Sequence, residues 1–402
     1  MKSFEEAITV LSSITAPFEK ETIRLEEAAG RILAENIYAD RDYPPFNRAA
    51  MDGYAVMQSD WDKGVRTYSV IDTIFTGEPA RHSLVSGACY KIMTGAATPE
   101  IANLIIRRED ARELEGKVVL HADKIRAYQN IARQGEDSKA GTLLLSAPLS
   151  CTPQVIGLLA TVGKSVLTVY KLPKVAVVTT GDEVVSPDAS LSPFQIRNSN
   201  QYLLRALLGQ WQIEPVLCTH VSDDKDKLTA TLTAAMDADL VIINGAVSAG
   251  DADHVPAVLQ DLGVKTLFHK VGIRPGKPLL TGKAPSGTVV FALPGNPLSC
   301  LTTFTIFVEH YLYLCFGYAH RPFQTRSLLE GRTKKHPLTE FFPVSTDHSG
   351  ALNLLPFNGS GDVTACINAQ GLAMQPAASM QLNPHDAVTF YPFNQISNNH
   401  YN

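Results

Sequence analysis

Hydrophobic and polar residues repeat with different periods along the chain, and each period marks a region. Near the N-terminus, Ser3 and Glu6 have the spacing of a capping box, and apolar residues recur at helical spacing over 4–11. A second helical pattern covers 23–34 and ends near Asn36. The start of the chain is therefore predicted to contain two helices.

Between residue 38 and about 137, short β-like runs broken by glycine replace the helical pattern. The clearest runs are 67–71, 88–92, 104–106 and 117–120. The segment 143–170 then predicts a short apolar run, a helix near 153–162 and a strand. We expect an all-β module inserted into one discontinuous N-terminal domain.

From residue 173 the pattern becomes a regular alternation of strands and helices. Strands are predicted at 174–180, 213–219, 239–244, 266–270 and 288–293, and helices near 200–211, 224–236, 254–262 and 298–313. This alternation predicts a doubly wound α/β domain with a parallel sheet. After a linker at 318–322, the remainder is β-like and suits a small β-barrel or sandwich. The predicted domains are 1–40 with 141–172, 41–140, 173–320 and 321–402.

Composition narrows the class of protein. The 402 residues are 45% hydrophobic and 19% charged with a formal net charge of −5, which favours a soluble globular protein over a non-specific nucleic-acid binder. The six cysteines form no C-x-x-C pair, so free thiols in a reducing compartment are expected. The N-terminus lacks the layout of a signal peptide, and no uninterrupted apolar stretch reaches membrane-spanning length. We expect a cytoplasmic protein that binds neither nucleic acid nor membranes.

Three predicted strands run directly into turns that carry glycine and polar side chains. The turns are 180–183, 244–253 and 294–297. Neighbouring parallel strands end at the same edge of a sheet, where α/β domains bind ligands. These turns therefore predict one crevice lined by carboxylates, backbone N–H groups and a helix N-terminus.

The first and third turns each have a structural explanation as well as a functional one. In the first turn, Gly181 allows a tight bend. The acids that follow either bind a metal ion or act as a general base, or Asp182 simply caps the next helix. In the third turn, Pro297 suits the first helical position. The N–H groups after Pro297 make an anion site, unless the turn is simply a well-built connection.

The second turn also has both a functional and a structural explanation. Its backbone N–H groups and the Ser248 hydroxyl suit an anion, and Asp251 and Asp253 suit a hard cation. A flexible loop with a helix cap at Asp253 is the alternative. Nearby, Lys270, Arg274 and Lys277 form a proline-stiffened cationic loop, which suits an anion or is a solvated surface turn.

In order and spacing, eight segments together resemble the molybdopterin molybdenumtransferase family (MoeA, with the matching domain of gephyrin). They are 30–34, 51–56, 92–96, 129–131 with 135–137, 180–183, 247–248 with 250–253, 274–278 and 293–297. The resemblance covers nearly the whole chain. It implies a multidomain fold of α/β plus β type, with a discontinuous elongated N-terminal domain, an inserted β domain, a molybdopterin-binding α/β domain and a C-terminal β-barrel.

The resemblance also implies a reaction. Such enzymes insert molybdate into adenylylated molybdopterin, release AMP and form molybdenum cofactor with the help of Mg²⁺. Breaking a phosphoanhydride uses a divalent ion held by carboxylates, which agrees with the acids in the turns. The family builds its site between the subunits of a homodimer, and molybdopterin adenylyltransferase and molybdoenzyme maturation proteins are its expected partners.

Motif matches assign roles to individual residues. The catalytic positions fall on Asp52, Thr94, Asp137, Glu183, Asp223 and Asp253, and the metal positions on Glu183, Asp251 and Asp253. The positions that meet molybdopterin, the AMP phosphate or molybdate are Thr180, Gly181, Asp182, Gly245, Ser248, Lys270, Arg274, Lys277, Pro294, Gly295, Asn296 and Pro297.

Several positions depart from the family pattern. An Asp-Asn-Ser-type string is replaced by Asn47-Arg48-Ala49, and Ala246 stands where a glycine is expected. Asn198 stands where an acid is common, and Ala132 and Gln134 replace basic residues. If position 246 needs a positive φ, alanine costs on the order of 1 kcal/mol there.

These departures keep a second function open. A divergent paralogue would hold molybdopterin or molybdenum cofactor without turnover, as a carrier, sensor or scaffold. The changes at Asn47 and Ala246 favour that alternative, whereas Asp52, Glu183 and Asp253 favour the enzyme. A molybdopterin adenylyltransferase is a third alternative, opposed by the length of chain outside the α/β region.

Overall fold

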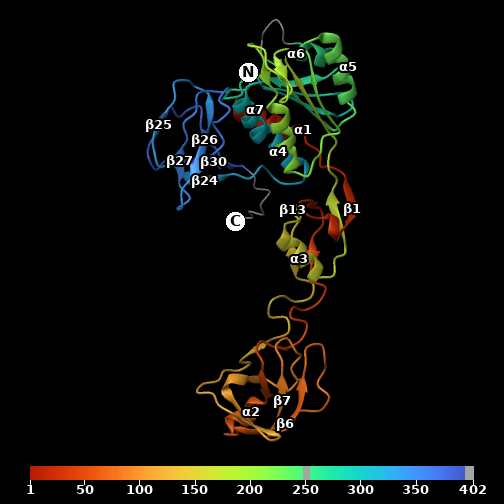
Figure 1. Cartoon of the computed structure of the whole chain (residues 1–402), viewed down its shortest axis with the longest axis vertical. Coiled ribbons are helices and arrows are strands. Elements are labelled where there is room, and N and C mark those ends of the chain that lie inside the picture. Colours follow the sequence, from red (N-terminus) through yellow and green to blue (C-terminus); the bar gives the residue numbers. More distant parts are fainter. Residues whose placement is uncertain (248–253, 394–402) are drawn as a thin grey trace. The chain divides into compact units, whose positions relative to one another are not determined.

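The computed structural model describes residues 1–247 and 254–393, which fall into two compact units. The first unit comprises Met1–Glu35, Ala147–Ile156 and the chain from Val166 onward. The second comprises Asn36–Ser146 and Gly157–Ser165. Figure 1 shows the course of the chain by colour.

The centre of the first unit is a six-stranded sheet in the order β18-β15-β19-β23-β22-β20. Four neighbouring strands are parallel, and β22 runs antiparallel to both of its neighbours. The strands are β15 (Val175–Thr180), β18 (Leu217–Val221), β19 (Leu240–Asn244), β20 (Lys265–His269), β22 (Leu280–Lys283) and β23 (Val289–Leu293). The pattern predicted five of these strands but not β22, so the expected all-parallel sheet is mixed.

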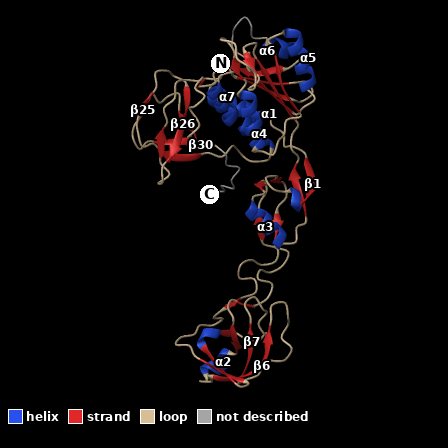
Figure 2. Ribbon diagram, viewed as in Figure 1, coloured by secondary structure: helices blue, strands red, loops and turns tan. Residues whose placement is uncertain are grey.

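Helices cover both faces of this sheet (Figure 2). Val177 faces a core shared with Leu204 and Phe304, whereas its neighbour Val178 packs with Leu228 and Val258 on the other side. This alternation follows from the period-2 geometry of a strand that is buried on both faces. The helices are α4 (Asn200–Gly209), α5 (Lys225–Ala235), α6 (Val255–Asp261), α7 (Pro297–Thr303), a π-helical turn at Phe304–Val308 and α8 (Glu309–Cys315).

The continuous helical run Pro297–Cys315 has the length and composition of a membrane span, which the apolar pattern alone did not predict. Its most apolar window is 89% buried inside the protein. It also contains Glu309, which forms an ion pair with Arg321 at 2.8 Å. The run is therefore a core helix of the α/β region.

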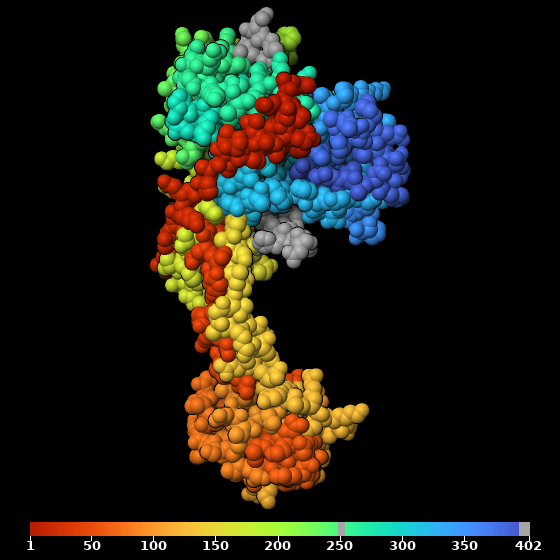
Figure 3. Space-filling model, turned by 180° about the vertical axis from the view of Figure 1, so that it is seen from behind, coloured from red at the N-terminus to blue at the C-terminus, as the bar shows by residue number. Residues whose placement is uncertain are grey.

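The predicted N-terminal helix is present as α1 (Phe4–Ile14). The capping box is confirmed, with Ser3 accepting from Glu6 N–H and Glu6 accepting from Ser3 N–H. The Phe4 ring lies 6.0 Å from that of Phe307 and 5.4 Å from that of Phe341, between ring centroids. Figure 3 shows this N-terminal segment in red against both the α/β region and the C-terminal β region. The helix thus joins the two regions through one core.

The helix predicted over 23–34 is wrong. The chain forms β1 (Lys20–Arg24), a 3₁₀ turn at Leu25–Glu27 and β2 (Ile32–Leu33). β1 pairs along its whole length with β14 (Val166–Tyr170), in a four-stranded sheet completed by β2 and β13 (Leu149–Ser150). Pairing with a strand far along the chain overrides the local helical spacing, as tertiary context commonly does.

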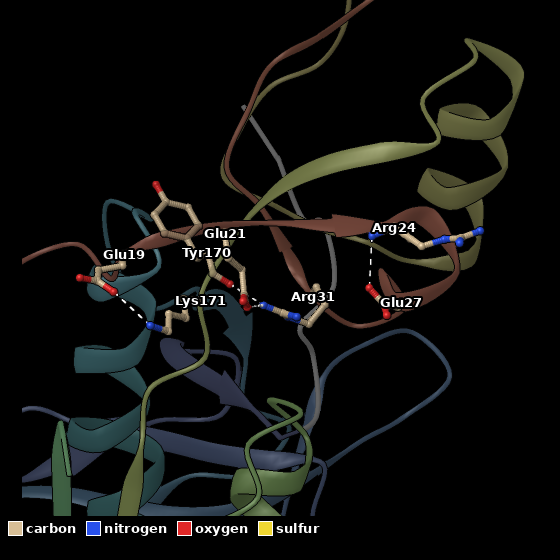
Figure 4. A network of polar contacts seen from close by, with 7 residues as sticks. All are labelled: Glu19, Glu21, Arg24, Glu27, Arg31, Tyr170 and Lys171. Carbon is tan, nitrogen blue, oxygen red and sulfur yellow. Dashed lines mark hydrogen bonds and ion pairs between the residues drawn. The ribbon is translucent and has the colours of Figure 1, made fainter. Parts of the chain in front are cut away.

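Ion pairs hold this small sheet in place (Figure 4). The Arg31 guanidinium donates to the Glu21 carboxylate at 2.5 Å and to the Tyr170 carbonyl at 2.9 Å. Lys171 and Glu19 form a further pair at 3.2 Å. These contacts link β1 with the end of β14, so the early and late segments of the predicted discontinuous region lie in one sheet. Helix α3 (Pro153–Thr161) follows β13, close to its predicted position.

The second unit is built mainly of β-strands, as the pattern predicted. Its main sheet has the order β8-β5-β7-β6-β10-β9. Its strands are β5 (Gly53–Val56), β6 (Thr67–Ile74), β7 (Ala88–Ile92), β8 (Leu104–Arg107), β9 (Ala111–Leu114) and β10 (Lys117–Leu120). The unit also contains α2 (Gln58–Asp62) and the paired short strands β4 (Arg48–Ala49) with β11 (Ile131–Ala132), and β3 (Ile37–Tyr38) with β12 (Leu143–Leu145).

The C-terminal region forms a sheet that also recruits a strand from the α/β region. The order is β21-β26-β28-β30-β24, with β27 on β26 and a separate ladder of β25 with β29. The bounds are β21 (Ile273–Arg274), β24 (Gln324–Ser327), β25 (Arg332–Thr333), β26 (Thr339–Thr346), β27 (Leu352–Leu354), β28 (Gly371–Gln375), β29 (Gln381–Leu382) and β30 (Ala387–Pro392). Because β21 pairs with β26, the predicted cationic loop is anchored in this sheet.

Candidate functional site

The three polar turns leave the central sheet at the same edge. β15, β19 and β23 are adjacent and parallel, with Thr179 opposite Asn244 and Asn244 opposite Leu293. The Gly245 N–H donates to the Leu293 carbonyl at 3.2 Å. The turns therefore start side by side, as the strand pattern predicted.

Gly245 allows the first two turns to pack directly against each other, and Gly295 of the third turn lies in ordinary contact with it. A Cβ on Gly245, where φ is +103°, would lie 2.6 Å from the carbonyl oxygen of Thr180. A Cβ on Gly295 would lie 3.7 Å from Cα of Gly245. A side chain at 245 would clash with backbone that cannot move aside, so this glycine is required by a close approach as well as by its φ.

Buried asparagines lock the second turn to the third. The Asn244 amide donates to the Pro294 carbonyl at 2.8 Å, and the Asn200 amide donates to Asn244 Oδ1 at 2.9 Å and to the Gly295 carbonyl at 2.5 Å. The Asn200 Oδ1 atom is buried and has no partner among the described residues. Sequence reasoning missed Asn200, and its only signal was an amide at the start of a predicted helix beside the turns.

In the first turn, most polar groups are engaged in holding its shape. The Thr180 hydroxyl donates to the Asp223 carboxylate, and the Asp223 N–H donates to Asp182 Oδ1 at 3.0 Å. Asp182 thus fixes the loop after β18 rather than capping the helix that follows in sequence. Glu183 is exposed, and no described residue forms an ion pair or hydrogen bond with its carboxylate.

The backbone of the first turn requires glycine. Gly181 has a φ of +139°, and a Cβ there would lie 2.9 Å from Oε2 of Glu183. The short strands β16 (Val184–Val185) and β17 (Ile196–Arg197) follow and pair in parallel. The Glu183 side chain therefore folds back over the glycine, and its carboxylate lies beside the turn.

The second turn is described only as far as residue 247. Ala246, the residue that replaces an expected glycine, has a φ of +47°, in the left-handed region that alanine disfavours. Ser248, Asp251 and Asp253 lie outside the described residues. The N-cap position of α6 is His254.

The third turn begins α7 with Pro297 at the first helical position, as predicted. However, not all of the N–H groups that follow are available for an anion. The Leu298 N–H donates to the Ser360 carbonyl at 3.1 Å, and the Asn296 amide donates to the Ser360 hydroxyl at 2.8 Å. A loop of the C-terminal region therefore covers part of this helix N-terminus.

The cationic loop is rigid and lies beside the same helix. A Cβ on Gly276, where φ is +105°, would lie 2.5 Å from a methyl carbon of Thr303, so the loop packs closely on α7. Arg274 and Lys277 are exposed, and Lys270, with a φ of +67°, is half-buried. No described carboxylate forms an ion pair with any of the three. Their positive charge is therefore available to an anionic ligand.

The second unit brings two of the predicted residues together. Asp52 accepts hydrogen bonds from both the backbone N–H and the hydroxyl of Thr94, each at 2.7 Å. These bonds hold the pKa of the Asp52 carboxyl below its ordinary value, with the backbone bond the larger cause. Gly53 follows at a position where a Cβ would lie 2.1 Å from the Ile106 carbonyl oxygen. Asp52 thus lies directly before β5, and both donors of Thr94 hold its carboxylate in place.

Asp137 belongs to the same unit but is not joined to Asp52 or Thr94 by a hydrogen bond among the described residues. Its backbone N–H donates to the Tyr43 carbonyl at 3.0 Å. Asn47, one of the residues that differ from the family pattern, accepts a hydrogen bond from the Gln134 N–H at 2.8 Å. It therefore shapes the loop that carries Asp137. Neither unit alone contains every predicted site residue.

Among residues 1–247 and 254–393, no group of three histidine, cysteine or acidic side chains is arranged to hold a metal. The unpaired Glu183 carboxylate is a hard oxygen donor of the type that Mg²⁺ prefers. It therefore suits Mg²⁺ as one ligand, and the other two predicted ligands lie in the undescribed part of the second turn.

Known proteins resemble this chain in sequence over nearly its whole length. A family model for the "MoeA N-terminal region (domain I and II)" matches residues 2–163, and one for a "Probable molybdopterin binding domain" matches 176–313. The molybdopterin molybdenumtransferase of Haemophilus influenzae is 36% identical over 96% of this chain and 97% of its own. The enzyme of the same name from Bacillus subtilis is 32% identical over 93% and 90%.

Solved structures give the same result. A molybdopterin biosynthesis MoeA protein from Pyrococcus horikoshii superimposes with a TM-score of 0.82 at 27% identity, covering 98% of this chain and all of that chain. The fold thus defines a multidomain protein of α/β plus β type, and the candidate site lies at one edge of its central sheet. The chain belongs to the molybdopterin molybdenumtransferase (MoeA) family, the transferases of molybdenum cofactor biosynthesis.

The Asp52–Thr94 contact makes a prediction about proton binding. Thr94→Val removes the hydroxyl donor and keeps the backbone donor, so the pKa of Asp52 should rise part of the way towards its ordinary value. NMR titration of the Asp52 carboxyl measures this. A folded-state pKa that lies below the unfolded-state pKa stabilises the fold at pH values above the unfolded-state pKa. This stabilisation should be lost as the pH falls through the folded-state pKa, and the loss should occur at a higher pH in the variant. Thr98→Val, whose hydroxyl contacts only the Asn47 carbonyl, is the control. An unchanged pKa in Thr94→Val would contradict the assignment.

The conformation of Ala246 makes a prediction about stability. Ala246→Gly should stabilise the fold by about 0.5–1 kcal/mol, because relief of the left-handed strain exceeds the added entropy of the unfolded chain. Urea unfolding measures the difference. The same change at the exposed helical residue Ala206 should instead destabilise by about 1 kcal/mol. Equal losses at both positions would show that Ala246 is unstrained.

Proposed function

We propose that the protein inserts molybdate into adenylylated molybdopterin in a Mg²⁺-dependent reaction that releases AMP and forms molybdenum cofactor. The observation that carries this proposal is the convergence of the three turns at one sheet edge, with the cationic loop packed on the same helix. A pterin with an anionic dithiolene and phosphate needs both polar backbone groups and positive charge, and this edge supplies both.

The chain's own groups suggest how the substrate is held. Lys270, Arg274 and Lys277 meet its anionic groups, and the turn residues 180–182, 245 and 294–297 line the pterin. Ser248 adds a hydroxyl donor. The buried Asn200 Oδ1 atom is an acceptor without a protein partner, and it suits a donor such as a pterin amine. Substrate binding would then satisfy a group that the fold leaves unpaired.

Glu183, Asp251 and Asp253 are the residues that would hold Mg²⁺. When bound, the ion neutralises charge on the phosphoanhydride oxygens. Glu183 supports this assignment because no described residue forms a hydrogen bond or ion pair with its carboxylate. Asp182 and Asp223 instead fix the surrounding turn through their hydrogen bonds. Asp223 thus acts on the proposed site by positioning.

We also propose that the site is completed between the subunits of a homodimer. Asp52, Thr94 and Asp137 belong to the second compact unit and the three turns to the first. An aspartate is charged at neutral pH even at its ordinary pKa, so Asp52 would offer a charged carboxylate to a bound cation. The Thr94 hydroxyl orients that carboxylate.

The four-domain division remains part of this proposal, with domains at 1–40 with 141–172, 41–140, 173–320 and 321–402. The pairing of β1 with β14 supports the discontinuous first domain, and the antiparallel strands β26, β28 and β30 support a β-barrel at the end of the chain. A cytoplasmic location and exchange with an adenylyltransferase and with cofactor-accepting proteins belong to the same proposal.

The alternative of a non-catalytic paralogue that binds molybdopterin has one specific observation in its favour. Ala246 adopts the strained left-handed conformation in the turn that the substrate would contact. Strain at this position does not remove any of the proposed reacting groups, so we favour the enzyme.

Glu183→Gln should reduce AMP release from adenylylated molybdopterin, molybdate and Mg²⁺ by at least a hundredfold, because a charged metal ligand becomes a neutral amide. The fold should be unchanged, because the side chain is exposed and unpaired. Asp188→Asn, an exposed acid that contacts Ser186 in the following loop, is the matched control and should retain activity. Near wild-type rates for Glu183→Gln would exclude its role as a ligand.

The proposed shared site makes a complementation prediction. Asp52→Ala and Glu183→Ala should each be inactive alone, because each lacks one half of every site. Co-refolded mixtures should recover part of the activity, because mixed dimers contain one site with both halves intact. Activity would stay absent in the mixtures if each subunit used only its own residues.

A further inference from the structure

A line of hydrogen bonds runs beside the first turn and connects the segment before α4 with β15 and β18. The Asn198 side-chain amide donates to the Thr179 hydroxyl oxygen at 2.8 Å, and that oxygen lies 3.0 Å from Nδ1 of His220. On the other side of the ring, His220 Nε2 lies 3.1 Å from the Gly181 carbonyl oxygen. Thr179 and His220 are cross-strand neighbours, and Thr179 and Asn198 are almost completely buried.

The chemistry of the two ends fixes the direction of every bond. A carbonyl oxygen only accepts, so the proton of His220 must lie on Nε2. The Asn198 amide is oriented because its Oδ1 accepts the Gln201 N–H at 3.1 Å, which turns its NH₂ group toward Thr179. A neutral His220 then offers Nδ1 as the acceptor for the Thr179 O–H. Each donor therefore points from Asn198 toward Gly181.

We propose that His220 is a positioning residue of the first turn, and that the amide at 198 maintains the hydrogen-bond direction on which this positioning depends. Nε2 holds the carbonyl of Gly181, whose φ of +139° sets the course of the turn into Asp182 and Glu183. The consequence for Glu183 rests on the proposed function, whereas the direction of the bonds does not.

An acid at position 198 would reverse the direction of the hydrogen bond between residue 198 and the Thr179 hydroxyl. A carboxylate has no donor, so the Thr179 hydroxyl would turn its hydrogen toward residue 198. Two acceptors, the Thr179 oxygen and His220 Nδ1, would then face each other. The conflict is relieved when the ring takes a second proton, and the result is a cation next to the two hydrogen-bonded loops that carry Asp182 and Asp223. Asn198 and His220 are therefore a matched pair.

Nitrogen NMR of ¹⁵N-histidine-labelled protein at pH 7 tests the direction. Wild-type His220 should carry a proton on Nε2 and none on Nδ1, and Asn198→Asp should shift both nitrogens to the positions of a doubly protonated ring. Adding Thr179→Val to Asn198→Asp removes the hydroxyl that transmits the effect, so the ring should return to the neutral form. A wild-type ring protonated on Nδ1, or a ring unaffected by Asn198→Asp, would overturn the proposal.

A second experiment tests the positioning. His220→Leu should accelerate amide exchange over 181–184 and raise the Mg²⁺ concentration for half-maximal AMP release by about three- to tenfold, as expected for one lost hydrogen bond. His220→Gln keeps a side-chain N–H and should recover part of both effects. Thr219→Val is the control, because its hydroxyl contacts only the His220 carbonyl, at 3.4 Å.

The two readouts separate this inference from the proposed function. Faster exchange in His220→Leu together with full activity in Glu183→Gln would retain the positioning and remove the proposed role of Glu183. Unchanged exchange in a folded His220→Leu protein would overturn the positioning, whatever the activity.

Discussion

The approach of Gly245 to the carbonyl oxygen of Thr180 is the contact on which the site depends. Three parallel strands end side by side, and their turns fit together only because position 245 has no side chain. This packing places Asn244 and Asn200 within reach of the third turn. The next residue, Ala246, lies in the left-handed region. The site is thus formed by backbone that has little freedom to move, which favours preorganised binding of a rigid ligand.

Charged and polar groups at the sheet edge divide into those that build the site and those left free. Asp182 and Asp223 are held in fixed hydrogen bonds, and the Thr180 hydroxyl is committed to Asp223. The Glu183 carboxylate accepts no hydrogen bond from a described residue, and the side chains of Lys270, Arg274 and Lys277 form no ion pair with a described carboxylate. For the buried Thr180 hydroxyl, pairing avoids the cost of a buried polar group without a partner. An exposed charge remains hydrated until a ligand displaces the water. The free groups are therefore the ones that a substrate or ion can engage.

The sequence predicted this edge because its signals are local. Strand runs followed by glycine turns give the order of elements, and parallel pairing then brings the turns together, so the convergence at 180, 245 and 294 could be anticipated. The helix predicted over 23–34 failed because β1 pairs with a strand far along the chain. β22 was missed because it is short and contains Gly282. The bonds of Asn200 and His220 depend on three-dimensional neighbours, which no spacing along the chain reports.

The pairing of β21 with β26 has a consequence for how such a protein can change by rearrangement of its gene. The loop that carries Arg274 and Lys277 begins in the sheet of the C-terminal region and then packs on α7. Loss or exchange of the segment after residue 320 would leave this loop without its strand partner, although none of its cations would be altered. A C-terminal segment exchanged as an independent module would therefore have to supply a strand that pairs with β21, or the loop would lose its anchor.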